Sequence, residues 1–168
     1  NPDQMKNLVG ELAKSYDYVL IDSPAGIEMG FRNAIAGAQE ALIVTTPEIA
    51  AVRDADRVIG MLEIHSVKRM HLIVNRIRPK MVQANEMMSV QDVQEILAIP
   101  LIGIVPDDER IIVSSNRGEP LSLATELSVP GTAYHNIARR LAGEKVAFLD
   151  FDVPPDGFFT RLRRLFQN

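Results

Sequence analysis

Asp22 closes a short apolar run at residues 18–21, which reads Tyr-Val-Leu-Ile. A carboxylate at the carboxyl end of a buried strand can hold Mg²⁺, usually through water. Ser23, Pro24, Ala25 and Gly26 follow, and small residues let the backbone come close to a ligand. An aspartate that caps the next helix would give the same pattern, so these residues alone leave both roles open.

Three further apolar runs, at residues 41–45, 71–74 and 101–105, are short, rich in β-formers and apolar on both faces. Together with residues 18–21 they predict strands of a parallel sheet that is covered on both sides. The segments between them carry apolar residues at three- to four-residue steps, which predicts helices. The stripes are Met5, Leu8, Leu12 and Ala13; Phe31, Ile35 and Ala38; Val52, Ala55, Ile59 and Leu62; Val90, Val93, Ile96 and Leu97, with Ser89 as N-cap; and Ile137 and Leu141 after Pro130-Gly131.

Alternation of strands and helices predicts an α/β fold, a doubly wound and mostly parallel sheet flanked by helices. Ligands of such sheets bind at the carboxyl ends of the strands. We therefore expect the functional residues directly after each apolar run, at Asp22, Thr46-Pro47, Asn75-Arg76 and Pro106-Asp107.

The charge of the chain is unevenly distributed along the sequence. Residues 157–168 hold three arginines and no acid, whereas the remainder has 15 basic and 22 acidic residues. An acidic body argues against nucleic-acid binding, and a basic tail indicates a local anionic partner. The chain has no cysteine, which excludes disulfides and cysteine-ligated zinc within it.

The basic tail has the pattern of an amphipathic helix that lies in a membrane surface. Residues 150–156, with Pro154-Pro155, predict a linker between a body at 1–149 and this tail at 157–168. A terminal helix docked on the body, or one that binds a partner, would show the same spacing. The apolar face and its flanking cations are Phe158, Phe159, Leu162, Leu165 and Phe166, with Arg161 and Arg164.

A tail of this size should bind a membrane only weakly. Burial of five large side chains contributes about 10 kcal/mol, and three arginines near anionic lipid contribute about 3 kcal/mol. Ordering of the helix costs about 9 to 14 kcal/mol. Two tails on one dimer would bind far better, because the second contact becomes intramolecular.

Several motifs in one order resemble the MinD family of P-loop ATPases, within the deviant Walker A class. The resemblance covers essentially all 168 residues, and residues 30–34 resemble cyanobacterial or plastid members. The matching segments are 22–28 (DSPAGIE), 45–48 (TTPE), 52–57 (VRDADR), Asn75-Arg76, 106–108 (PDD) and 116–120 (NRGEP).

This resemblance implies an ATPase whose two subunits pack face to face around ATP and Mg²⁺. Asp22 would be the Walker B carboxylate on the Mg²⁺ side. The amide of Asn75 can donate and accept at once, as reading an adenine edge requires, and Arg76 can stack on the base. Pro106 and Asp107 would form the other wall of the base pocket.

The charged start of the helix predicted after residue 48 has two interpretations. It can be a solvated face with ion pairs three and four residues apart. The resemblance implies instead a surface for the septum inhibitor MinC and the regulator MinE, formed by Glu48, Arg53, Asp54 and Asp56. The protein would then act at the inner face of the cell membrane, or in the plastid stroma at the inner envelope.

The family's phosphate-binding loop has no counterpart in these 168 residues, which contain no Gly-x-x-x-x-Gly-Lys-Thr/Ser. We therefore expect apolar sheet edges to be exposed and this chain alone not to hydrolyse ATP. Mg²⁺-dependent ATP turnover by the purified chain would contradict that expectation. Two other readings stay open: a sister ATPase for flagellar number or for chromosome or plasmid partition, and a non-enzymatic membrane adaptor on a degenerate α/β domain.

Overall fold

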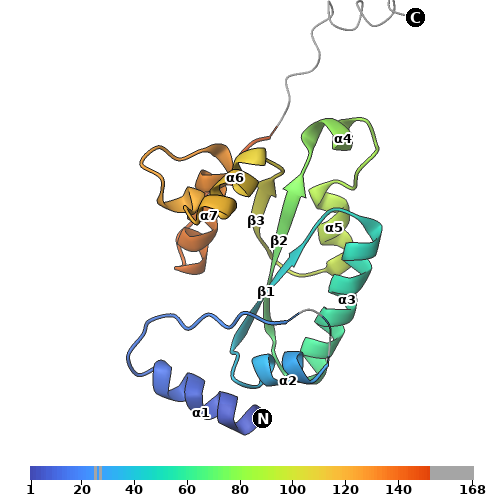
Figure 1. Ribbon diagram of the computed structural model, residues 1–168. Helices are drawn as coiled ribbons and strands as arrows, with labels where there is room; N and C mark the ends of the chain where they lie inside the picture. Colours follow the sequence, from blue (N-terminus) through green and yellow to red (C-terminus); the bar gives the residue numbers. More distant parts are fainter. Residues whose placement is uncertain (25, 27, 152–168) are drawn as a thin grey trace, which may run out of the picture.

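Three of the four predicted strands form one parallel sheet in the order β1-β2-β3. The computed structural model describes residues 1–24, 26 and 28–151, and Figure 1 shows its sheet with helices on both sides. The strands are β1 (Glu40–Thr45), β2 (Arg69–Ile77) and β3 (Leu101–Pro106). This arrangement confirms the predicted parallel α/β class.

All five helices predicted in the body at 1–149 are present, and the capping chemistry explains two of their starts. Ser89 accepts a hydrogen bond from the Asp92 N–H, and the Asp92 carboxylate accepts one from the Ser89 N–H, which is a capping box. Ser128 caps the last helix by accepting from the Gly131 N–H. The bounds are α1 Pro2–Leu12, α2 Met29–Ala36, α3 Ile49–Ile64, α5 Val90–Leu97 and α7 Val129–Leu141.

Three short elements add to those predicted from the sequence. They are α4 (Pro79–Gln83), α6 (Glu109–Arg117) and the 3₁₀ turn η1 (Leu121–Leu123). Asp108 begins α6 by accepting a hydrogen bond from the Arg110 N–H. Among the described residues, no helix combines the length and apolarity needed to cross a bilayer.

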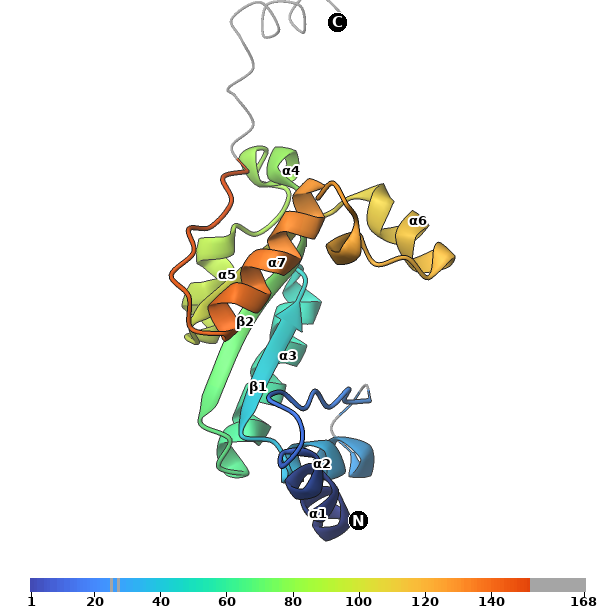
Figure 2. The ribbon, with the colours of Figure 1, turned by 90° about the vertical axis from the view of Figure 1, so that its left-hand side faces the viewer.

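The prediction of a strand at residues 18–21 is wrong for this structure. This segment has no regular secondary structure, and Tyr18 and Leu20 are 67% and 84% exposed. A strand needs a hydrogen-bonded neighbour, and β1 pairs only with β2 in the described part of the chain. Figures 1 and 2 show the segment after α1 running across the strand direction rather than alongside β1.

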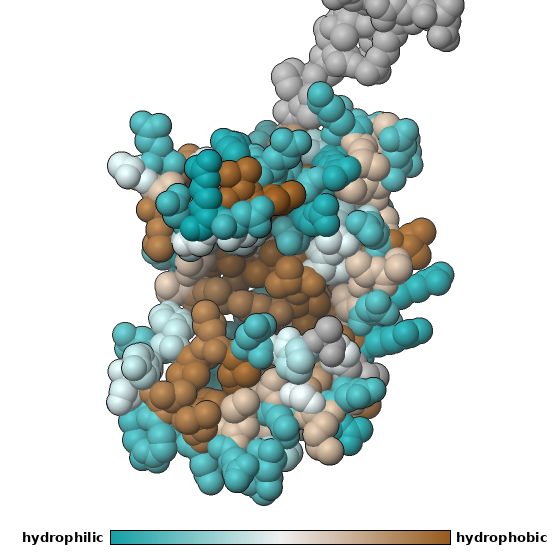
Figure 3. Space-filling model, in the orientation of Figure 1, coloured by the Kyte–Doolittle hydropathy of each residue, from teal (hydrophilic) through white to brown (hydrophobic). Residues whose placement is uncertain are grey.

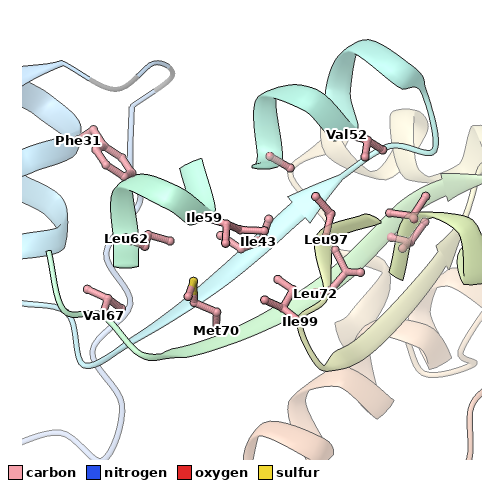
Figure 4. Packing of buried hydrophobic residues seen from close by; sticks show 13 residues of the cluster. Phe31, Ile43, Val52, Ile59, Leu62, Val67, Met70, Leu72, Leu97 and Ile99 are labelled. Carbon is pink, nitrogen blue, oxygen red and sulfur yellow. The ribbon is translucent and has the colours of Figure 1, made fainter. Parts of the chain in front are cut away.

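Two apolar clusters hold the sheet between its helices. On one face, α3 and α5 pack against β1 and β2, with Val52, Leu62 and Val93 buried against Leu72 and Val74 (Figure 4). On the other face, α7 packs through Ala133 and Ile137 against β2 and β3 (Figure 2). β2 is therefore covered on both sides, as predicted.

The second face of β1 is open, in contrast to the prediction that every strand is covered on both sides. Leu42 and Val44 are 38% and 57% exposed, because α7 reaches only β2 and β3. Figure 3 shows a hydrophobic area here, between α7 above and α1 and α2 below. Among the described residues β1 also pairs only with β2, so these exposed apolar side chains belong to an edge strand of the sheet.

Candidate functional site

The pairing of β2 with β3 brings two of the predicted strand ends together. Ile77 lies opposite Pro106 in the register, and the Asp107 N–H donates to the Ile77 carbonyl oxygen at 3.0 Å. Arg76, which follows Asn75, therefore contacts Asp107 although the two residues lie 31 positions apart in sequence. The residues predicted at the ends of β2 and β3 therefore lie at the carboxyl edge of the sheet.

Asp107 is the centre of this edge, because two arginines share its carboxylate. Arg76 Nε donates to Oδ1 at 3.2 Å, and Arg78 donates through Nε to Oδ2 at 2.5 Å. The Asp107 side chain is 24% exposed, and both guanidinium groups are half exposed. Bonds between ionised groups are shorter and stronger than neutral ones, so this pair of contacts ties the end of β2 to the end of β3.

Arg78 was not among the residues predicted for the site. No spacing in the sequence signals its role, because the left-handed backbone of Arg76 breaks the extended alternation of β2. Arg78 follows the last residue of β2, and its contact with Asp107 depends on this local irregularity.

The pKa of Asp107 reflects this competition between burial and charge. Burial works to raise the pKa, but the hydrogen bonds and positive charges of Arg78 and Arg76 outweigh it, so the pKa lies below its ordinary value. The Arg110 guanidinium lowers the pKa of Asp108 in the same way, against the smaller effect of burial. Both carboxylates are therefore ionised at neutral pH.

Asn75 and Arg76 adopt an irregular backbone where β2 departs from its register with β3. Arg76 has a φ of 59°, a left-handed conformation that is uncommon for residues other than glycine and costs about 1 kcal/mol or more. The Asn75 Oδ1 accepts a hydrogen bond from the Arg76 N–H at 3.0 Å. This bond fixes the amide plane of Asn75 and leaves its NH₂ group as the available donor.

The residues at this edge suit the base of a nucleotide. Asn75 presents a donor, Pro106 forms a buried apolar wall, and the Arg76 guanidinium offers a planar cation. The guanidinium already holds Asp107, so a base that stacks on it would do so while the ion pair persists or after it opens.

Asp22 does not join this cluster. It is exposed and makes no side-chain hydrogen bond or ion pair with any described residue. Within the described ranges, no three His, Cys, Asp or Glu side chains come together as a metal site. One carboxylate does not fill the octahedral shell of Mg²⁺, so the described residues do not by themselves fit this metal.

The charged surface predicted at the start of α3 is exposed to solvent. Arg53, Asp54 and Asp56 lie on the face of α3 opposite its buried stripe, and Glu48 precedes the helix as its N-cap residue. Arg57 and Asp54 form an ion pair at 3.6 Å with both side chains more than 70% exposed. Such pairs contribute little stability, so the sheet does not need this surface for its fold.

The predicted membrane residues Phe158, Phe159, Arg161, Leu162, Arg164, Leu165 and Phe166 lie outside the described part of the chain. A shallow groove of about 540 Å³ is lined by residues that include His71, Leu101 and Arg140. It lies at the amino ends of β2 and β3, so it is separate from the strand-end cluster.

Comparison with known proteins assigns this chain to a class, the P-loop NTPases of the ParA family. A family model described as "ParA: NUBPL iron-transfer P-loop NTPase" matches residues 4–142, so the chain belongs to that family. Within it, the resemblance to MinD proteins is confirmed. The chain is 58% identical over 98% of its length to a septum site-determining protein MinD of Synechocystis sp., and 62% identical over 98% to a putative one of Guillardia theta.

Solved structures agree with this assignment. The MinD cell division protein of Aquifex aeolicus has a TM-score of 0.85 at 43% identity, over 89% of this chain and 64% of that one. The MinC:MinD complex of the same organism has a TM-score of 0.84 at 42% identity, over 90% of this chain and 63% of that one. A septum site-determining protein MinD of Pyrococcus horikoshii, complexed with Mg-ADP, has a TM-score of 0.73 at 25% identity, over 84% of this chain and 56% of that one.

The chain spans about 60% of the length of the curated relatives it matches, 62% and 61% for the two named above. The activity, ligands and partners of those complete proteins therefore do not follow from the match alone.

The shared carboxylate generates a stability prediction. The folded-state pKa of Asp107 is lowered. The contribution of this carboxylate to folding stability is therefore present above about pH 4 and is lost as the pH falls through the folded-state pKa. Replacement by Asp107→Asn should lower the melting temperature at pH 7 by about 2–4 °C. The difference from the unaltered protein should shrink toward pH 3.

The matched control is Asp54→Asn, which breaks an ion pair between two highly exposed side chains. It should change the melting temperature by about 1 °C or less at either pH. Equal effects of the two substitutions at pH 7 would contradict the assigned role of Asp107.

Proposed function

We propose that the complete protein is a MinD-like ATPase that binds membranes reversibly and positions the division septum by recruiting a septum inhibitor. The observation that carries this proposal is the 58% identity to a septum site-determining MinD across 98% of the chain. The strand-end cluster supports it independently, since it offers the groups that a purine base needs. Neither the sister ATPases nor an adaptor is favoured by a specific observation.

In the proposed mechanism this chain supplies the base end of the nucleotide site. The Asn75 amide, held by its bond to the Arg76 N–H, would donate to the adenine edge. Pro106 would contact one side of the base, and Asp107 would hold Arg76 beside it. Arg78 would keep the Asp107 carboxylate in place when Arg76 moves, because it binds the other carboxylate oxygen.

The phosphate end would come from residues that these 168 do not contain. ATP and Mg²⁺ would supply the phosphoryl group and the charge that offsets it. Asp22 would be the one carboxylate that this chain contributes near the ion. We accordingly expect the chain to retain base recognition but not phosphoryl transfer.

Iron transfer, named in the family description, is not the function we propose. Iron–sulfur clusters are held chiefly by cysteine thiolates, and the 168 residues contain no cysteine. Nucleic-acid binding is not proposed either, because the body without the tail is acidic.

The proposed membrane switch combines the weak tail with nucleotide-driven dimerisation. In the homodimer with ATP, two tails would reach one anionic surface, whereas the monomer would have one tail and leave it readily. The protein would thus cycle between the cytoplasm, or the plastid stroma, and the adjoining membrane.

A single substitution in the tail tests this switch. Leu162→Glu places a charge on the apolar face and should abolish ATP-dependent binding of the complete protein to anionic vesicles in a sedimentation assay. Nucleotide affinity should be unchanged. Leu123→Glu is the matched control, since Leu123 is 81% exposed on the body and should leave vesicle binding intact. Loss of both activities, or of neither, in Leu162→Glu would count against the proposal.

The partner surface on α3 is tested by reversing one charge. The relative of known structure is solved as a MinC:MinD complex, and Asp56 is exposed on α3 with no ion pair to a described residue. Asp56→Lys should weaken binding of the septum inhibitor about tenfold or more in a calorimetric titration. Glu63→Lys, on the same helix but near its other end, should have no such effect; equal losses would assign the inhibitor elsewhere.

A further inference from the structure

A single arginine near the end of α7 holds the last described part of the chain against the sheet. The Arg140 guanidinium donates to three backbone carbonyls, those of Val146 at 3.0 Å, Ala147 at 2.7 Å and Ile102 at 2.9 Å. Its charged carbon also lies 4.1 Å from the centre of the Phe148 ring. One side chain thus joins α7, the edge strand β3 and the segment 143–151, which we name the strap.

The strap depends on such side-chain contacts because it forms no helix or strand. Gly143, with a φ of 88°, turns the chain out of α7, and Leu149 packs against the cluster under α7. Phe148 is 44% exposed, so the apolar anchoring is shallow. Burial chiefly, with a smaller effect of Arg139, lowers the pKa of Arg140, as expected for a guanidinium drawn partly out of water.

The course of the strap places the end of the described body at a particular edge. α7 runs antiparallel to the strands, and Figure 2 shows the strap returning from the lower end of α7 toward α4, which follows β2. Figure 1 shows the same exit at the arrowhead end of the strands. The strap therefore ends near the carboxyl edge of the sheet, and not at the end of α7.

We infer that Arg140 is a positioning residue that fixes the point where the membrane-binding tail leaves the body. The inference rests on the proposed function for the role of the tail. With the strap held, the tether between body and tail is the predicted linker 150–156. With the strap released, the tether begins at Gly143 and is about twice as long.

A longer tether weakens binding only when two tails act together. Doubling a flexible tether lowers the effective concentration of the second tail about threefold. One tail on a monomer gains nothing from its neighbour, so its affinity should not depend on the strap. The contact between Arg140 and the strap should therefore affect membrane binding of the ATP-bound dimer alone.

The experiment compares Arg140→Met with the unaltered complete protein. Cleavage after Lys145 by a lysine-specific protease should accelerate roughly tenfold, because the strap loses its hydrogen bonds to a charged donor. Affinity for vesicles of equal parts phosphatidylcholine and phosphatidylglycerol should fall about threefold with ATP and stay unchanged with ADP. Nucleotide affinity should also be unchanged, whereas damage to the fold would lower it.

Arg139→Met is the matched control, since the Arg139 side chain bonds the Glu144 side chain at the start of the strap and leaves the strap carbonyls untouched. It should behave as the unaltered protein in both assays. Phe148→Leu, which removes the ring but keeps Arg140, should reproduce the Arg140→Met result more weakly and serves if that variant does not fold.

The outcomes separate this inference from the function on which it rests. Unchanged cleavage after Lys145 in Arg140→Met, or faster cleavage with undiminished ATP-dependent vesicle affinity, would overturn the inference and leave the proposed function standing. If the unaltered protein binds no vesicles with ATP, the proposed function is overturned. The role of Arg140 in positioning the tail is then overturned as well.

Discussion

Parallel pairing on both edges of β2 is the constraint on which the rest of this structure depends. Leu72 and Val74 of this strand are fully buried, between α3 and α5 on one side and α7 on the other. Hydrogen bonding to β1 and to β3 fixes the register, so the residues that end β2 have no freedom to choose their neighbours. This pairing brings Arg76 and Arg78 to Asp107.

The Asp107 carboxylate then ties the end of β3 to the end of β2. It is held by Arg78 through one oxygen and Arg76 through the other, which keeps the strand ends together without a ligand. Under the proposed function, one arginine would turn toward a base while the other retains the carboxylate. The left-handed Arg76 is the cost of that geometry, and strained residues of this kind gather where ligands bind.

Local patterns predicted the elements whose partners lie within the chain. Helical stripes such as Val52, Ala55, Ile59 and Leu62 are buried as expected, and the residues at 41–45, 71–74 and 101–105 are strands because each has a neighbour to pair with. Residues 18–21 have the same composition but no paired neighbour, so composition alone misled. An apolar run indicates a preference for the strand conformation, but a strand also needs a neighbouring strand with which to form hydrogen bonds.

The sequence predicted where the candidate site residues lie, but not which side chains bond to one another. Chain order placed Asn75 and Asp107 at the carboxyl edge, because that follows from topology. The sharing of Asp107 between two arginines depends on side-chain reach across a bulge, which no sequence spacing encodes. The same holds for Arg140, whose three carbonyl acceptors come from β3 and the strap.

Nucleotide selectivity tests the central claim, that the β2–β3 edge reads the base, most directly. Equilibrium binding of ATP and GTP would be measured on the complete protein and on Asn75→Ala, with exposed Asn7→Ala as control. The account predicts that Asn75→Ala raises the Kd for ATP about tenfold or more while the Kd for GTP changes little, since one base contact is lost. An unchanged preference for ATP over GTP in a folded Asn75→Ala protein would contradict it.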